Sequence, residues 1–549
     1  MKLLTDLFDP NRSHGPMRSL KRPLYSWALS GGHVPEQLVM LPPDPWMGDA
    51  GRGRWVINRV ADFHGMHVSL ETCVWPDSKL ARDPIQGPVI HSFEFLRDLR
   101  SLGGDQARRL GRTLMQEWMV DNRHWRDGAW GWAVTGRRIA SWLMGYEFFC
   151  SSADDAFLES LYASMMRQVR HLDRADPGRL HGLDALYVIR ALIFAGLSLE
   201  GGEDRLEDAL AWLDHWVTHE LDGQGMHISR SPAVCVASAR VLIDIRGSLV
   251  RAGYASPTTL QAAIDRLMHA VRFFRLADSK LACFHGGAED DATALDALFR
   301  VSGVKIRKSP TQLEDAGFES LTREKVCVIL DCGTPARQPH DRTGHASPLA
   351  FEMSVGRERM IVNCGTHQTD PVWEDHLRAT AAHSTLVIDD RNAYEITPTG
   401  HFGRAATKID SRRDLVAHGI MFTASHDGYV PLNGLVHTRR ITLATDGTML
   451  EGEDILSCDA PLVKPAPFAV RFHLHPRVQA SVIQDGQAIL LRMPSGSGWR
   501  FYKEGAGLAL EPSIYCGADG APRKTMQIVL TGQSDGSGTS VRWQFSEER

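Results

Sequence analysis

The hydrophobic pattern of this chain changes its period once, near residue 310. From about residue 91 to 305, apolar residues recur every three to four positions, as the segment 206–217 illustrates. From about residue 318 they alternate with polar residues, as in the segment 349–355. The first spacing is typical of amphipathic helices and the second of strands in a half-buried sheet. The pattern predicts a helical domain over 91–305 and a β-domain over 318–549.

The arrangement of these segments predicts how each domain is built. Breaks with Gly, Pro, Asp or Asn separate the helical segments, which favours paired helices in a toroid or solenoid. The later segments are short and numerous, with hairpin turn signals at Asp446–Gly447 and Asp485–Gly486. Many short strands in series are typical of a β-sandwich with Greek-key links. Residues 1–90 are rich in Pro, Gly and Trp, so we expect an irregular segment that packs on the helical domain.

Charge and motif content exclude several classes of protein. The chain has 61 Lys and Arg against 66 Asp and Glu, a net charge of −5, so it has no overall basic field for nucleic acid. No run approaches the roughly 20 apolar residues of a membrane span. No P-loop or dinucleotide-binding glycine motif is present. We therefore expect no nucleic-acid partner, no membrane span and no nucleotide cofactor.

The N-terminus and the cysteines bear on location. The first residues lack the apolar core of a secretory signal, and Asp6 and Asp9 stand early. The nine cysteines follow no CxxC or other spacing, which indicates reduced thiols rather than a disulfide framework. Both observations predict a cytoplasmic protein. A periplasmic location would require a leader ahead of this sequence.

A series of short motifs in a fixed order resembles the heparinase II/III family of polysaccharide lyases. They include HSFEFLRDLRSLGGD (91–105), TGRRIASWL (135–143), DGQGMHISRSP (222–232), GHASPLAFEMSVG (344–356), RMIVNCGT (359–366) and AAHSTLVIDD (381–390). The resemblance implies an incomplete α/α toroid followed by an antiparallel β-sandwich. It also implies β-elimination on a uronic-acid-containing polysaccharide, in keeping with the family's characterised members.

β-Elimination has three chemical requirements. The C6 carboxylate of the sugar must be neutralised, a base must remove the C5 proton, and an acid must protonate the leaving glycosidic oxygen. Arginine matches a carboxylate bidentately, and a tyrosine can transfer a proton if nearby cations lower its pKa. On these grounds the catalytic candidates are His227, Arg230, His285 and Tyr429. The candidates for binding an acidic sugar are Arg137, Arg138 and His181.

Plainer interpretations of the catalytic candidates stay open. Arg230 could instead cap a helix C-terminus or pair with Asp222. His285 could be an ordinary surface histidine. Tyr429 could fill a corner of the sandwich.

Three positions depart from the family's pattern. Position 343 is Thr where the family has the first histidine of a His-x-His pair. Val234–Cys235 stands where the family has Tyr-His, and Leu183–Asp184 where it has Asn-His. Two rivals to a lyase therefore stay open: a non-catalytic glycan-binding or envelope-assembly factor, and a glycoside hydrolase on the same fold. A hydrolase would need paired carboxylates, and we expect the adjacent pair Glu453 and Asp454 to face solvent.

The resemblance also implies a metal site formed by His345, Asn363 and His383. Imidazole nitrogen suits Zn²⁺ better than Ca²⁺ or Mg²⁺, whereas the neutral amide of Asn363 is a weaker ligand than a carboxylate. A bound Zn²⁺ would be mainly structural. The alternative is that both imidazoles hydrogen-bond to backbone at the edge of the sheet. The expected partners are an acidic oligo- or polysaccharide and, as an option, a second copy of the chain in a homodimer.

Overall fold

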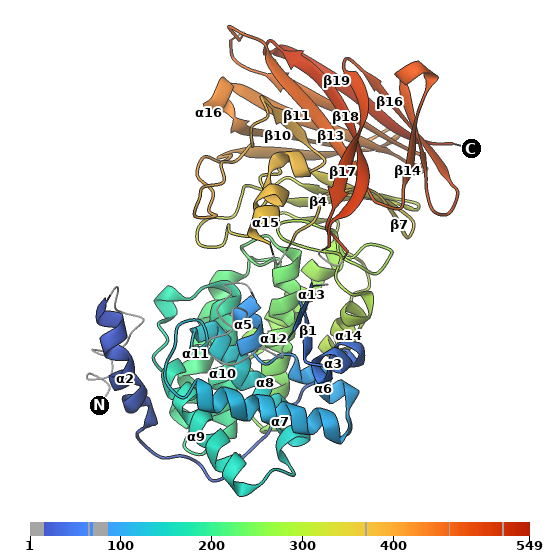
Figure 1. Ribbon diagram of the computed structural model, residues 1–549. Helices are drawn as coiled ribbons and strands as arrows, with labels where there is room; N and C mark the ends of the chain where they lie inside the picture. The colour runs from blue at the N-terminus through green and yellow to red at the C-terminus, as the bar shows by residue number, and fades with distance from the viewer. Residues whose placement is uncertain are drawn as a thin grey trace. The chain divides into compact units, whose positions relative to one another are not determined.

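The computed structural model describes residues 16–63, 66–69, 86–367, 370–460, 462–518 and 521–548. The chain divides into two compact units, each built from two stretches of sequence. The first unit comprises residues up to 220 together with 237–264, and the second comprises 221–236 together with 265–549. Figure 1 shows helices in the blue to green part of the chain and strands mainly in the yellow to red part.

The first unit is mainly helical. Its helices are α2 (Pro16–Ser30), α3 (Ala50–Ile57), α5 (Gln86–His91), α6 (Leu96–Leu102), α7 (Gly104–Asp121), α8 (Trp132–Cys150), α9 (Asp155–Leu172), α10 (Gly182–Ser198) and α11 (Glu203–Glu220), with the 3-10 turn Pro177–Arg179. Helices α12 (Pro232–Arg251) and α13 (Thr258–Phe274) begin or end in the second unit. Among the described residues, no helix is long and apolar enough to cross a membrane.

Local chemistry explains why these helices begin where they do and pack closely. The Asp154 carboxylate accepts a hydrogen bond from the Phe157 amide and so caps the start of α9. Helix α10 is buried around most of its circumference and contacts both α8 and α11. Gly136 permits the contact with α8, because a Cβ there would lie 2.6 Å from the Tyr187 carbonyl oxygen. This central helix supplies much of the apolar core of the unit.

The first 90 residues contain more regular structure than expected. Besides α2 and α3, the strands β1 (Val60–Phe63) and β2 (Met66–Ser69) form an antiparallel hairpin. In α2, the buried side chains of Tyr25 and Leu29 lie four residues apart. The two strands have only four residues each, and Pro23 interrupts the helical pattern of the 15-residue α2, so neither stands out in the sequence.

The second unit contains two antiparallel sheets. One sheet has the order β14-β15-β16-β19-β12-β11-β10-β9, and the other β17-β18-β13-β7-β6-β5-β4-β3 with β8 paired to β13. The strands are β3 (Gln312–Leu313), β4 (Phe318–Arg323), β5 (Val326–Asp331), β6 (Phe351–Val355), β7 (Glu358–Val362), β8 (Leu386–Ile388), β9 (Ile409–Val416), β10 (Gly419–Tyr429), β11 (Leu435–Ala444), β12 (Met449–Ser457), β13 (Ala466–Leu474), β14 (Gln479–Ile483), β15 (Ala488–Arg492), β16 (Gly498–Glu504), β17 (Gly507–Tyr515), β18 (Arg523–Ser534) and β19 (Ser537–Glu547). Short helices are α14 (Ala292–Ser302), α15 (Pro371–Arg378) and α16 (Val430–Asn433), with 3-10 turns at Thr380–Ala382 and Gln484–Gly486.

The two hairpin turn signals lie where the sequence predicts them. Asp446–Gly447 joins β11 to β12, and Asp485–Gly486 joins β14 to β15. The segment 265–305, assigned to the helical domain from its periodicity, clusters with the second unit.

The core of the second unit is apolar at its margins and charged at its centre. The rings of Phe351 and Trp543, from different sheets, stack with centroids 5.7 Å apart. Beside them the Asp454 carboxylate accepts hydrogen bonds from Arg439 Nε at 2.7 Å and Trp543 Nε1 at 2.8 Å. Asp454 is therefore buried, and the expectation that it faces solvent was wrong. Neighbouring strand residues point to opposite faces, so only one member of the pair Glu453–Asp454 lies on the outer side.

Candidate functional site

Three charged or titratable side chains from separate segments meet inside the second unit. Arg230 lies in the turn before α12, His285 in the loop between α13 and α14, and Asp331 at the end of β5. Arg230 Nη2 forms an ion pair with Asp331 Oδ1. His285 Nε2 lies 3.0 Å from Asp331 Oδ2. The exposed fractions of the side chains are 7%, 4% and 2% for Arg230, His285 and Asp331, so this ion-pair cluster is closed to bulk water.

The remaining hydrogen bonds fix the orientation of both basic groups. Arg230 Nε donates to the Ala316 carbonyl at 2.7 Å, and its guanidinium carbon lies 4.7 Å from the centre of the Phe318 ring. His285 Nδ1 accepts the His345 amide at 3.1 Å. A neutral imidazole carries one proton, so His285 has it on Nε2 and donates it to Asp331. Arg230 pairs with Asp331 and not with Asp222.

Burial and neighbouring charge act in opposite directions on these groups. Burial alone would raise the pKa of Asp331, but the Arg230 guanidinium and His285 outweigh it and hold the pKa at about 2. Burial lowers the pKa of His285, against the favourable charge of Asp331 and with the help of nearby Arg230. His285 is therefore neutral and lies between Arg230 and Asp331.

Two of these residues have unusual backbone conformations. Arg230 has φ 60° and His285 has φ 45°, both in the left-handed region. Residues other than glycine visit this region at a cost of about 1–2 kcal/mol, and such strain persists where the surrounding structure overdetermines it. In both residues, the surrounding hydrogen bonds hold the strained backbone and aim the side chain at Asp331.

His345 and His383 lie next to this cluster, with ring centroids 4.6 Å apart. His345 Nε2 accepts the Gly286 amide at 2.8 Å, so its backbone hydrogen bond agrees with the alternative considered for this residue. His345 Nδ1 and both ring nitrogens of His383 are buried without a hydrogen bond of normal geometry among the described residues. Burial, with smaller contributions from His473 and His285, lowers the pKa of His383 to about 3. Both rings are therefore neutral.

Two hydrogen bonds hold the side chain of Asn363 near the two histidines. Its Oδ1 accepts the Ser384 amide at 3.2 Å, and its Nδ2 donates to the Cys283 carbonyl at 3.3 Å. The amide is therefore oriented, with one lone pair of Oδ1 left over. The structure thus brings Arg230, His285, His345, Asn363 and His383 into one region of the second unit.

His227 and Tyr429 are also buried. His227 Nδ1 lies 2.8 Å from Ser229 Oγ, in the same turn as Arg230. The Tyr429 hydroxyl donates to the Leu386 carbonyl at 3.0 Å, and burial raises the pKa of Tyr429 above its ordinary value. This is the position of a residue that fills a corner of the sandwich, the alternative considered for Tyr429. Its proposed proton-transfer role stays a prediction.

The three candidates for sugar binding lie in the first unit, in different environments. His181 is exposed and precedes α10. Arg137 Nε donates to Glu94 Oε1 at 3.0 Å. Arg138 is fully buried, donates to the Gln168 side chain and to the His91 and Ala129 carbonyls, and lies 3.9 Å from the Trp118 ring centre. A sugar contact by Arg138 stays a prediction that would require these bonds to be released.

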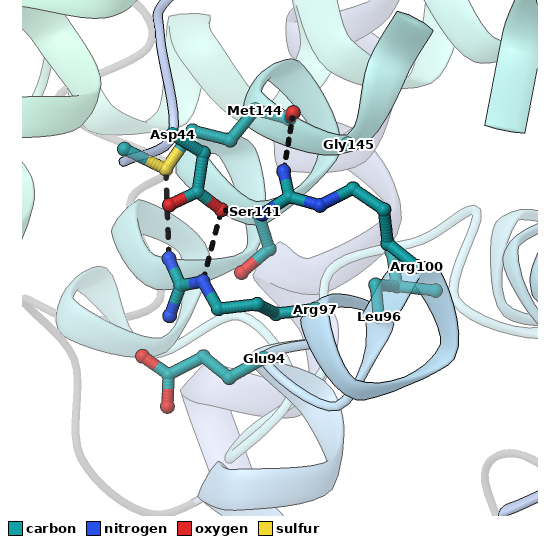
Figure 2. A pocket seen from close by; sticks show the side chains of 8 residues that line it. All are labelled: Asp44, Glu94, Leu96, Arg97, Arg100, Ser141, Met144 and Gly145. Atoms are coloured by element: carbon teal, nitrogen blue, oxygen red, sulfur yellow. Dashed lines mark hydrogen bonds and ion pairs between the residues drawn. The ribbon is translucent and has the colours of Figure 1, made fainter. Parts of the chain in front are cut away.

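A small hollow in the first unit is lined by Asp44, Glu94, Arg97 and Arg100, among others (Figure 2). Arg97 and Arg100 each form an ion pair of 2.9 Å with the Asp44 carboxylate. Burial would raise the pKa of Glu94, but the Arg137 guanidinium outweighs it and holds the pKa at about 2. Arg97 and Arg100 thus share the single carboxylate of Asp44, and Glu94 is paired with Arg137, so each arginine already has an anionic partner within the protein.

Asp331, which holds the cluster together, is not among the residues predicted from the sequence. It stands at the end of a strand in VCVILDCG, where a single acidic residue is common. Its partners Arg230 and His285 lie 101 and 46 positions away in the chain. At such separations the spacing of residues in the sequence does not show that they are in contact. The only local signal is an acidic residue that ends an otherwise apolar strand.

Comparison with known proteins gives three findings. Residues 305–544 match the family model described as "Heparinase II/III-like, C-terminal". FtsZ-localized protein C of Caulobacter vibrioides is 31% identical over 546 residues, which cover 95% of this chain and 93% of that protein. A crystal structure of heparinase III matches 97% of this chain and 90% of its own, at 13% identity and a TM-score of 0.75.

A mutant of heparan sulfate lyase HepC from Pedobacter heparinus is also similar in structure. It matches 96% of this chain and 88% of its own, at 15% identity and a TM-score of 0.64. At such identities the likeness concerns the fold. It confirms the predicted fold class, an incomplete α/α toroid followed by an antiparallel β-sandwich.

Proposed function

This chain belongs to the heparinase II/III-like family, and from that premise we propose that it is a lyase-like protein that cleaves a uronic-acid-containing glycan by β-elimination. The observation that carries the proposal is the gathering of Arg230, His285 and His345 around Asp331. Guanidinium and imidazole are the groups that the reaction requires, one for the carboxylate and the other for the proton.

The contacts of this cluster define what its residues do. The N–H groups of Arg230 and His285 already donate to Asp331 and, for Arg230, to the Ala316 carbonyl. In this form the two residues stabilise the structure of the site. Proton transfer to a sugar therefore needs a group nearer the surface. His227 is buried as well, and its ring lies next to His340, with centroids 5.7 Å apart, so its catalytic role stays a prediction.

A panel assay tests the proposal. The purified protein is mixed with heparan sulfate, hyaluronan, alginate and polygalacturonate, and the ultraviolet absorbance of the 4,5-unsaturated product is followed. Absorbance that rises with one of these polymers supports the proposal. New reducing ends without this absorbance would indicate a glycoside hydrolase, and the absence of both would exclude cleavage of the panel.

We also propose that the site takes Zn²⁺, with His345, Asn363 and His383 as its ligands. The neutral ring nitrogens of His383 have no hydrogen bond of normal geometry among the described residues, and Asn363 Oδ1 has a free lone pair. His345 would have to exchange its bond from the Gly286 amide for the metal, so the donor set fits a weak site. The ion would supply a fixed positive charge that holds the two loops together.

Metal content and thermal stability test the zinc site. Zinc near one equivalent in fresh protein, or a melting temperature that rises with added Zn²⁺, would support it. Asn363→Asp should bind Zn²⁺ more tightly, because a carboxylate is the better ligand. Less than about a tenth of an equivalent, with no change in melting temperature for either protein, would leave hydrogen bonding as the better account.

A second candidate function is that of a non-catalytic envelope-assembly factor. The full-length relative is named for its localisation with FtsZ, and the four catalytic candidates are buried here. If the protein has this function, a fluorescent fusion should follow FtsZ in cells, and the panel assay should give no product. We propose from the sequence that the protein lies in the cytoplasm. Diffuse fluorescence together with turnover would favour the lyase. Recovery in a periplasmic fraction would contradict the location.

A further inference from the structure

A histidine and an aspartate 60 positions apart form a dyad at the surface of the second unit. His401 Nδ1 lies 2.6 Å from Asp341 Oδ1, and Asp341 Oδ2 accepts the Phe402 amide at 2.7 Å. The Asp341 side chain is 1% exposed and the His401 side chain 17%. A buried carboxylate thus holds Nδ1 of an imidazole that reaches solvent. This fixes the proton on Nδ1 and leaves a lone pair on Nε2.

Three other histidine–carboxylate pairs among the described residues lack this combination. His285 and His437 lie at hydrogen-bond distance from Asp331 and Asp454, but their side chains are 4% and 0% exposed. His475 is 15% exposed, but its Nε2 lies 3.6 Å from Glu289, beyond hydrogen-bond distance. Among these pairs, only His401 has both an orienting carboxylate and access to a ligand.

The dyad is held rigidly by Arg378. This buried guanidinium donates to the backbone carbonyls of Asp341 at 3.1 Å, Gly344 at 2.8 Å and Gly400 at 2.9 Å. It thereby joins the loop that carries Asp341 to the hairpin that carries His401. A base whose supports are fixed in this way is preorganised for proton transfer.

A cation stands next to the free nitrogen of His401. Arg342 is exposed, and its Nε lies 3.3 Å from His401 Nε2, a long hydrogen bond. A carboxylate accepts two parallel hydrogen bonds from a guanidinium, so an arriving uronate would draw Arg342 away and release the Nε2 lone pair. The same loop carries Thr343, which stands where the family has a histidine, and a Cβ at Gly286 would lie 3.0 Å from Thr343 Cβ. The dyad thus belongs to the loop that borders His285.

We propose that His401 is the base of the reaction, with Arg342 as the carboxylate-binding residue and Asp341 as the positioning residue. This inference rests on the proposed function. Arg342 neutralises the C6 carboxylate, and His401 Nε2 takes the C5 proton. The C5–H electron pair becomes the C4=C5 double bond, the C4–O bond breaks, and the leaving oxygen takes a proton from water. His401 then returns its proton to water.

Chemical protection tests the binding part without any turnover. Diethyl pyrocarbonate acylates free imidazole nitrogen, and mass spectrometry gives the rate at His401. Sodium glucuronate bound through Arg342 should cover Nε2 and so slow this rate in the wild-type protein, glucose should not, and Arg342→Gln should abolish the protection. His219→Gln, at an exposed histidine of α11, should leave the protection unchanged. Equal protection by both sugars, or none, would overturn the carboxylate site.

Kinetics test the catalytic part. If the panel assay shows turnover, His401→Gln should lower kcat by about 100-fold or more with a small change in KM. Asp341→Asn should shift the pH profile of kcat, whereas Asp341→Glu should restore it in part. An unchanged kcat in His401→Gln would overturn the role as base while the lyase function stands. Glucuronate protection without turnover would support the binding site alone and would overturn the base together with the proposed function.

Discussion

Asp331 compensates two buried basic groups, and its removal tests how much the ion-pair cluster stabilises the protein. In Asp331→Asn the volume is kept, but the buried charge of Arg230 loses its partner. Breaking a buried ion pair from one side typically costs about 3–5 kcal/mol. We expect a clear fall in the thermal unfolding midpoint of the second unit. Asp296→Asn is the control, because the Asp296 side chain is 63% exposed and pairs with Arg275. This variant should change the free energy of unfolding by no more than about 1 kcal/mol.

The lowered pKa of Asp331 should also make the stability of the protein depend on pH. The pKa of Asp331 is about 2 in the folded protein against an ordinary value of 3.8. A carboxyl group with a lowered pKa stabilises the fold above its unfolded pKa, and this contribution is lost as the pH falls through the folded pKa. Its contribution of roughly 2 kcal/mol should therefore disappear between about pH 4 and pH 2. Urea unfolding across this range should show a shallower decline in Asp331→Asn than in the wild type.

Prediction at the scale of single residues depended on motifs. The motifs located Arg230, His285, His345, Asn363 and His383, which the structure brings together. They did not locate Asp331 or the pair Asp341 and His401, because those partners meet only through the tertiary fold. Sequence also does not reveal that a guanidinium is already satisfied, as in Arg138, since two of its acceptors are backbone carbonyls and a third, Gln168, lies 30 positions away.

At the scale of elements, strands β12 and β19 are joined through a glycine. Gly452 lies opposite Trp543 in the register, and a Cβ at Gly452 would overlap the indole ring. Gly452→Ala should push Trp543 away from Asp454 and Phe351 and destabilise the second unit by about 1–3 kcal/mol. Tryptophan fluorescence during thermal unfolding measures the change. Gly498→Ala is the matched control in the same sheet, because its Cβ would meet only the flexible Glu548 side chain, at 3.2 Å. Equal midpoints for both variants would contradict the packing argument.

Elements with several periods were the ones predicted well. The long helices α7, α8 and α10 and the strands β5 to β8, β11 to β13 and β15 follow the pattern of the sequence. The hairpin β1–β2 and helix α2 were not predicted, because the strands have four residues each and Pro23 interrupts the pattern of α2. The burial of Asp454 was also missed: alternation along β12 identifies two faces but does not say that the inner one contains a charged centre.

At the scale of the whole molecule, the buried thiols should be inert. The eight cysteines among the described residues are free, and six of them are buried. Burial raises the pKa of Cys150, Cys235 and Cys364 to about 12, which suppresses the reactive thiolate. With Ellman's reagent, Cys458→Ser should remove one fast-reacting equivalent, whereas Cys364→Ser should remove none. All nine thiols of the sequence should react in guanidinium chloride; fewer would reveal a disulfide.

The second unit is assembled from two stretches of sequence, and this has a consequence for dissecting the gene. Residues 221–236, which contain Arg230, are separated from the rest of the second unit by residues 237–264, which belong to the first unit. A fragment that begins at residue 305, the start of the match to the family model, would encode both sheets but neither Arg230 nor His285. Asp331 would be left without its partners. Such a fragment should be less soluble and melt lower than one that begins at residue 221, so the sequence match marks a region of similarity and not a unit that folds by itself.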